Sequence, residues 1–140
     1  MTGSTSGMAN LDWRHYYEKK QLIGRGAFGE ALTVKRLSNG AIFIMKKEKI
    51  LSMEKRKRKD EVNALKKCNH IHVVRYIDDF IDEKNSRIVM EYCNGGDLGK
   101  FIRAQRGQLL SSQMVGVWAL EIVSGLAYLK NQRIVHRDLV

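Results

Sequence analysis

Apolar and polar residues alternate along the first part of the chain with the period of β-strands. Leu32 and Val34, for example, are separated by a polar residue, and side chains two positions apart lie on the same face of a strand. The pattern predicts strands over residues 18–23 and 30–36, on either side of a glycine-rich turn, and an apolar strand over residues 41–45. Because only short turns separate them, we expect these three strands to be antiparallel.

The Asn39-Gly40 dipeptide predicts the turn between the second and third strands. Both residues tolerate positive φ, so they favour a hairpin turn with positive φ at both central positions. Two further strands are predicted over residues 75–81 and 87–93, joined by a polar turn that begins at Asp82. The five strands together predict one antiparallel sheet.

A helix is predicted between the third and fourth strands, over residues 52–68. Ser52 can cap it, strong helix formers fill it, and Val62 with Leu65 forms an inward-facing pair. Its other faces are charged and include the unbroken basic run 55–59. That run fits a nuclear-import or nucleic-acid contact, but a solvated helix face is the commoner explanation, and we expect no nucleic-acid partner.

Two more helices are predicted after the fifth strand. Asp97 can cap a short one, and Ser111 or Ser112 can begin a longer one. The longer helix has large apolar residues at helical spacing, namely Met114, Trp118, Ile122, Leu126 and Leu129. Because most of its other face is also apolar or small, we expect it to pack against more than one neighbour.

Composition narrows the class of protein. The chain has 140 residues, 44% of them hydrophobic, which suits an ordinary globular domain, and residues 1–12 are predicted to form a disordered tail. No run of about twenty apolar residues and no signal-like N-terminus is present, so we expect neither secretion nor a membrane partner. Cys68 and Cys93 lack C-x-x-C spacing. The net charge of +10 favours anionic partners without choosing among them. We expect a cytoplasmic protein, with the nucleus as the alternative.

Gly24, Gly26 and Gly29 form a G-x-G-x-x-G pattern, in which backbone amides can approach phosphate oxygens closely. A dinucleotide-binding Rossmann unit requires a helix directly after the glycines, whereas an alternating strand follows here. We therefore expect the glycine loop to cap a hairpin. An ordinary flexible turn is the alternative for these six residues taken alone.

Lys46 ends the apolar third strand, where a cation is costly unless it meets a negative partner such as a phosphate. If Ile44 points inward, so does Lys46, while Lys47 points to the opposite face. We expect a helix carboxylate to approach Lys46. Glu61 is the first choice because it borders the buried face of the helix, and Asp60 is the rival.

These motifs, in this order, resemble the protein kinase family, which combines a glycine loop, a strand lysine with its helix glutamate, and an H-R-D sequence. The resemblance covers residues 17–139 and includes His136-Arg137-Asp138. It implies that Lys46 holds phosphates, that Glu61 braces Lys46, and that Asp138 accepts the proton of the substrate hydroxyl.

The resemblance also implies a nucleotide site. Met90 resembles the gatekeeper, Glu91 and Cys93 belong to the hinge whose backbone binds adenine, and Asp97 lies where many kinases contact ribose. The implied nucleotide-binding residues are Ile23, Gly24, Gly26, Gly29, Ala31, Ile44, Lys46, Met90, Glu91, Cys93 and Asp97. The implied ligands are ATP and Mg²⁺. No metal ligand is assigned within the chain, and His70 and His72 lack the carboxylate or thiol companions of a metal site.

The implied fold is α+β: a kinase N-lobe with hinge over residues 13–93, made of a five-stranded antiparallel sheet and one helix, then the first helices of a C-lobe over 94–140. The glycine loop and the hinge segment 91–98 look most like those of NimA-related serine/threonine kinases. This implies transfer of the γ-phosphate of ATP to Ser or Thr hydroxyls of a protein substrate.

Some positions depart from the family pattern. Ala31 replaces the usual Val above the adenine, Ile44 precedes the lysine where a smaller residue is usual, and Ile71 replaces a Pro. After Val140 the metal-binding Asn and D-F-G segments are missing, so we expect residues 1–140 alone to be inactive. Two hypotheses stay open: a piece of a serine/threonine kinase, or a truncated nucleotide-binding or interaction module that docks a partner on the helix around Trp118.

Overall fold

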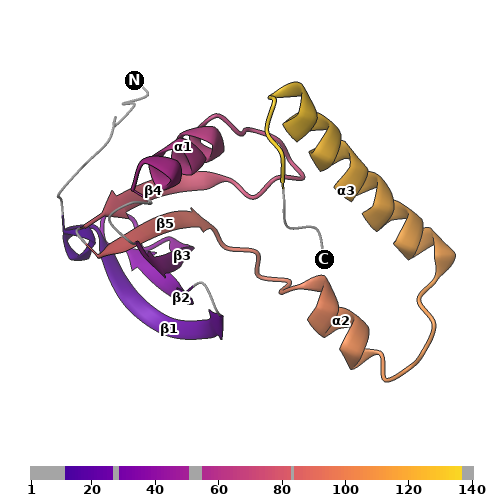
Figure 1. Cartoon of the computed structure of the whole chain (residues 1–140). Coiled ribbons are helices and arrows are strands. Elements are labelled where there is room, and N and C mark those ends of the chain that lie inside the picture. Colours follow the sequence, from indigo (N-terminus) through magenta and orange to yellow (C-terminus); the bar gives the residue numbers. More distant parts are fainter. Residues whose placement is uncertain (1–11, 27–28, 51–54, 83, 137–140) are drawn as a thin grey trace. The chain divides into compact units, whose positions relative to one another are not determined.

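The computed structural model describes residues 12–26, 29–50, 55–82 and 84–136 (Figure 1). The predicted tail to residue 11, the Ser52 cap, Asp138 and Val140 lie outside these ranges. The elements are η1 (Trp13–His15), β1 (Tyr17–Gly26), β2 (Gly29–Arg36), β3 (Ile42–Lys49), α1 (Lys55–Lys66), β4 (Tyr76–Ile81), β5 (Asn85–Glu91), α2 (Leu98–Ala104) and α3 (Ser112–Asn131).

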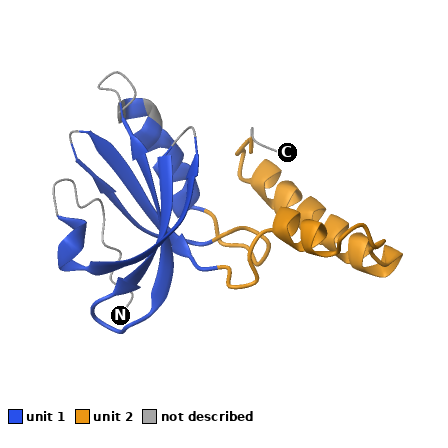
Figure 2. Ribbon diagram, turned by 90° about the horizontal axis from the view of Figure 1, so that it is seen from below, with its two compact units in different colours: residues 1–67, 75–92 blue, residues 68–74, 93–140 orange. Residues whose placement is uncertain are grey.

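The chain divides into two compact units, coloured separately in Figure 2. The first contains residues 1–67 and 75–92, and the second contains residues 68–74 and 93–140. The segment 68–74 thus leaves the first unit between α1 and β4 and belongs to the helical second unit. The predicted domain bounds at residues 12 and 93 stay predictions.

A five-stranded antiparallel sheet forms the first unit, in the order β1-β2-β3-β5-β4. The predicted α+β class, with a kinase-like sheet followed by helices, is confirmed. β3 continues to Lys49, beyond the predicted end at residue 45, and β5 begins at Asn85 rather than at residue 87. Both extensions are polar, so hydrophobicity gave no signal for them.

One face of the sheet carries the hydrophobic core. The register pairs Leu32 with Met45 and Met45 with Val89, and residues directly opposite in antiparallel strands share a face. The core cluster on this face, here called the core face, consists of Tyr17, Leu32, Val34, Met45, Phe80 and Val89. Burying six such side chains is the main stabilising contribution to this unit.

The turn between β2 and β3 differs from the predicted one. Gly40 has φ +72°, but Asn39 is not among the described residues with positive φ, so the expected turn with two positive φ values is wrong. The Asn39 side chain instead accepts a hydrogen bond from the Ala41 amide, and the Arg36 amide bonds the Ala41 carbonyl. Four residues therefore close the hairpin, because the Asn side chain stabilises a wider loop.

Capping residues set the helices of the second unit. The Asp97 carboxylate accepts from the Lys100 amide at the start of α2, and the Ser111 hydroxyl accepts from the Met114 amide at the start of α3. Both predicted caps are confirmed, with Ser111 chosen over its neighbour.

The segment 68–74 packs against α3. The His70 ring stacks on Tyr128 at 4.9 Å, and a Cβ added to Gly125 would lie 2.7 Å from the His72 carbonyl oxygen. Most other residues of α3 are exposed, with Leu120 at 72%. By length and by a hydropathy of 1.2 the helix also passes the test for a membrane span, as do core helices of soluble proteins.

Candidate nucleotide site

The β-sheet register brings several predicted site residues onto the face opposite the core. Gly24 pairs with Ala31, and Ala31 pairs with Lys46. Ile44 lies two residues before Lys46 in β3 and pairs with Met90. These five residues therefore share one face, here called the site face. Glycine backbone, apolar side chains and one cation are the groups that a nucleotide's phosphates and base require.

The three glycines of the loop have different roles. A Cβ on Gly29 would lie 2.0 Å from the Lys47 carbonyl oxygen, and its φ of +152° disfavours other residues. Gly24 and Gly26 have no atom within 4 Å of such a Cβ. Gly29 is therefore required for β2 to pack on β3, whereas Gly24 and Gly26 leave open space beside the backbone. Gly26 pairs with Gly29, which confirms that the loop caps a hairpin and that a strand follows.

The inward-pointing position predicted for Lys46 in an apolar strand implies a buried ammonium group, and this is wrong, because the Lys46 side chain is 48% exposed. Its Nζ lies 2.6 Å from Oε1 of Glu48, two residues further along β3. The neighbouring Lys47 extends from the opposite face and lies 3.8 Å from Glu30, as the alternation predicts.

Glu48 is a buried carboxylate, only 5% exposed. Besides Lys46, it forms an ion pair with Arg58 of α1. A buried carboxylate needs such partners because desolvation of the charge is otherwise unfavourable. Sequence reasoning missed both Glu48 and Arg58, although Glu48 has the same strand parity as Lys46 and Arg58 lies one helical turn before Val62.

Glu61 does not contact Lys46 within ion-pair distance in the part of the chain that the structure describes. Its carboxylate accepts from Arg58 at 2.7 Å, and its side chain is 52% exposed. Asp60, the rival candidate, is exposed. Arg58 thus lies between two carboxylates, and the order of contacts is Lys46, Glu48, Arg58, Glu61.

The last strand of the first unit ends at the predicted hinge. The Glu91 amide donates to the Arg75 carbonyl at 3.0 Å, and the Glu91 side chain accepts from the Arg75 amide at 2.9 Å. These bonds fix the backbone of Glu91 at the end of β5. Ile23, 43% exposed, lies where the β1–β2 register shifts.

The remaining predicted site residues fall elsewhere. Cys93 and Asp97 belong to the second unit, where Cys93 is exposed. The hydrogen bond from the Lys100 amide lowers the pKa of Asp97, as expected at a helix N-terminus. Asp138 lies outside the described residues. The roles assigned to these residues stay predictions.

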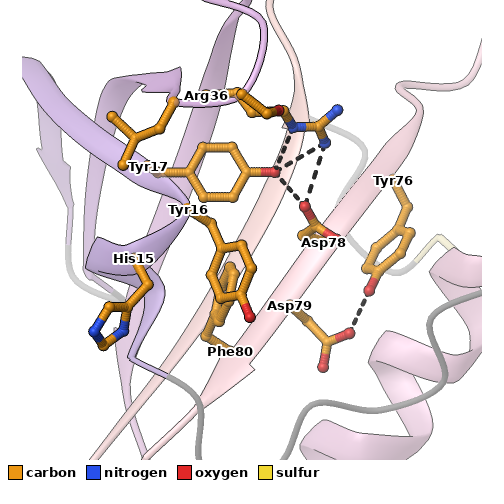
Figure 3. A pocket seen from close by; sticks show the side chains of 10 residues that line it. His15, Tyr16, Tyr17, Arg36, Tyr76, Asp78, Asp79 and Phe80 are labelled. Atoms are coloured by element: carbon orange, nitrogen blue, oxygen red, sulfur yellow. Dashed lines mark hydrogen bonds and ion pairs between the residues drawn. The ribbon is translucent and has the colours of Figure 1, made fainter.

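A separate pocket of about 350 Å³ lies on the first unit (Figure 3). Its polar groups already bond to one another: the Tyr17 hydroxyl donates to Asp78, and Arg36 donates to both, at 2.9 Å and 3.3 Å. The Tyr76 hydroxyl likewise donates to Asp79. Burial, followed by the bond to Asp78, raises the pKa of Tyr17 to about 12. None of the predicted site residues lines this pocket.

Comparison with known proteins identifies the family of this chain. The model of the protein kinase domain matches residues 17–139. Human serine/threonine-protein kinase Nek5 is 38% identical over 126 residues, covering 88% of this chain and 18% of Nek5. Mouse Nek1 and the probable kinase nek3 of Dictyostelium discoideum are each 35% identical, over 126 and 128 residues, covering 88% of this chain and 10% and 11% of those proteins.

The chain therefore spans about a fifth or less of the length of these three relatives. The similarity to NimA-related kinases predicted from the glycine loop and hinge is confirmed. With the antiparallel sheet, the glycine hairpin and the strand lysine in place, the family match leads to one conclusion: the chain belongs to the protein kinase domain family, with NimA-related serine/threonine kinases among its relatives.

Proposed function

We propose that the chain is the ATP-binding part of a protein serine/threonine kinase. The observation that carries the proposal is the β-sheet register, which places Gly24, Ala31, Ile44, Lys46 and Met90 on one face. The family match over residues 17–139 supports it independently. In this proposal ATP is the phosphoryl donor, and Mg²⁺ accompanies its phosphates.

Each residue on the site face has its own role in the proposed binding of ATP. The open space at Gly24 and Gly26 lets their backbone approach phosphate oxygens, and Lys46 donates to the same oxygens. The side chains of Ala31, Ile44 and Met90 form an apolar surface for the adenine ring. Compared with the usual family pattern, Ile44 of β3 is larger and Ala31 of β2 is smaller, so side-chain volume is moved from β2 to β3.

The family resemblance assigns the remaining roles in the proposed reaction. Backbone groups of Glu91 and Cys93 bind the adenine edge, Asp97 binds the ribose, and Asp138 accepts the proton of the substrate hydroxyl. The substrate is a Ser or Thr hydroxyl of a protein.

The test is ATP affinity of the 140-residue chain, measured by isothermal titration calorimetry. Lys46→Met weakens ATP binding about 10- to 100-fold, the effect of losing a charge-assisted bond to phosphate. Lys47→Met is the matched control, since Lys47 belongs to the same strand but to the opposite face, and it leaves affinity within about twofold. Equal affinities for wild type and Lys46→Met contradict the proposal.

The exposed face of α3 supports a second candidate, a non-catalytic interaction module. Leu120 and Val123 are 72% and 60% exposed, and exposed apolar patches mark interaction surfaces. Trp118 itself is half-buried against Phe101, with ring centroids 5.4 Å apart. This candidate predicts self-association or partner capture that Leu120→Lys abolishes, measured by light scattering and pull-down. A monomer that captures nothing excludes it.

A further inference from the structure

We propose that Glu48 is the positioning residue of Lys46 in this chain, and that Glu61 acts on Lys46 only through Arg58. The proposal rests on the proposed function, because it concerns how the nucleotide-binding lysine is held. It reassigns to a strand residue the part that the family resemblance gives to a helix residue.

Strand geometry makes the Lys46–Glu48 pair local. The two residues are two positions apart in β3, so their side chains leave the same face of the sheet. The Nζ to Oε1 distance is 2.6 Å, within the range of a charge-assisted hydrogen bond. The pair forms within one strand and therefore does not depend on where α1 lies.

Burial makes Glu48 a rigid anchor. Its side chain is 7% exposed, against 48% for Lys46 and 52% for Glu61. Packing and two ionic partners hold a buried carboxylate in one position, whereas a half-exposed one samples several rotamers. Of the two carboxylates, Glu48 is thus the one able to fix the direction of the lysine.

Arg58 keeps the lysine available to a phosphate. Lys46 contacts Oε1 of Glu48 while Arg58 contacts Oε2 and also pairs with Glu61, so Glu48 is shared between two cations and Arg58 has a second carboxylate partner. A Lys ammonium group has three donors, and Glu48 accepts from one of them. The exposed part of Lys46 can therefore still donate to phosphate oxygens.

Glu61 is one contact further away. It accepts from Arg58 at 2.7 Å, and in the described part of the chain its ion pair is with Arg58 alone. Replacing Glu61 therefore loosens Arg58 directly and affects the position of Lys46 only indirectly, through Arg58 and Glu48. This ordering distinguishes the proposal from a direct Lys46–Glu61 pair.

The first experiment measures the pair without nucleotide. The rate at which an amine-acylating ester modifies Lys46 in the 140-residue chain is followed by mass spectrometry, with exposed Lys49 as internal reference. Glu48→Gln speeds acylation of Lys46 about threefold or more by releasing its ammonium group. Glu18→Gln, which removes an exposed strand glutamate paired to Lys20, is the matched control and changes nothing at Lys46.

The second experiment compares ATP with adenosine, so that the phosphate contribution is isolated. Glu48→Gln weakens ATP binding about fivefold and leaves adenosine binding unchanged, since only the phosphates meet Lys46. In the Lys46→Met background, Glu48→Gln has no further effect. If Glu48 only stabilised the fold, Glu48→Gln would lower the affinities for both ATP and adenosine. It would also do so in the Lys46→Met background.

The Glu61→Gln variant keeps the proposal testable even if Glu48→Gln does not fold, because Glu61 is half exposed. Its loss of ATP affinity is smaller than that of Glu48→Gln and stays below about twofold. A tenfold loss on Glu61→Gln, or a gain in ATP affinity on Glu48→Gln, overturns the proposal. If wild type binds no ATP yet the acylation contrast appears, the positioning pair stands and the proposed function fails.

Discussion

The two faces of the sheet carry similar ionic groups in opposite settings. On the core face, the Tyr17 cluster (Tyr17, Arg36 and Asp78) balances one cation against one carboxylate, and the buried Tyr17 hydroxyl bonds to both. On the site face, the Lys46 cluster (Lys46, Glu48, Arg58 and Glu61) has two cations and two carboxylates, and Lys46 and Glu61 at its two ends are about half exposed.

The difference teaches which charges serve stability and which are left for a ligand. The core-face cluster lies beside aromatic rings, among them the partly buried Phe43, whose ring centroid lies 4.7 Å from the Arg36 guanidinium carbon. Its two charges are paired with each other. The site-face cluster leaves the Lys46 ammonium group half exposed at one end of the chain of contacts. Changes to the first should therefore unfold the chain, and changes to the second should alter binding.

The largest expected effect comes from Tyr17→Ala. Tyr17 is 2% exposed in the core cluster, and truncating a large buried aromatic lowers the free energy of unfolding by about 3 to 5 kcal/mol. Urea denaturation followed by circular dichroism measures the loss. ATP affinity of the molecules that stay folded is unchanged. Tyr17→Phe, which keeps the ring and removes only the hydroxyl bonds, costs about 1 to 2 kcal/mol.

A smaller effect separates two glycines of the same loop. Gly29→Ala lowers the free energy of unfolding by about 2 to 3 kcal/mol, because the added Cβ meets the Lys47 carbonyl and the φ is strained. Gly24→Ala changes it by less than about 1 kcal/mol, since its surroundings are open. Equal losses in thermal or urea unfolding would mean that the close β2–β3 contact does not decide the difference.

The smallest effect is a pH dependence of stability. Burial raises the pKa of Tyr17 from 10.0 to about 12, so the folded state holds the phenol proton more tightly than the unfolded state does. The resulting contribution of Tyr17 to the free energy of unfolding is fully present below pH 10 and is lost as the pH rises through about 12. Since the Tyr17 hydroxyl lies beside the partly exposed Arg36 and Asp78 side chains, solvent screens the effect and the loss is about 1 to 2 kcal/mol. Unfolding curves of wild type and Tyr17→Phe should therefore converge over this range, and a constant gap contradicts the assignment.

Much of the sheet could be predicted because its signal is local. Alternation around Leu32 and Val34 fixed which side chains face the core, and the strand after Gly29 excluded a Rossmann unit. The same parity placed Ile44 and Lys46 together. Helix capping by Asp97 and Ser111 could also be predicted from the sequence, because a cap involves only neighbouring residues.

The ion-pair partners could not be predicted as reliably, because the Glu48–Arg58 pair depends on where α1 packs against β3. Glu61 was favoured on helix position alone, whereas Glu48 gains its partners from both strand and helix. Arg58 was grouped with a solvated basic run, but its side chain is only 18% exposed and lies between two carboxylates. The Asn39 turn failed for a similar reason, since a side-chain bond to Ala41 outweighed the backbone preference.

Titration of the ¹⁵N-labelled chain with ATP, followed by amide chemical shifts, tests the central claim most directly. The account predicts shifts at Gly24, Gly26, Ala31 and Ile44 on the site face, and much smaller ones at Val34 and Val89, which are buried on the core face. Shifts confined to the core face or to the Tyr17 pocket, or none at millimolar ATP, would contradict it.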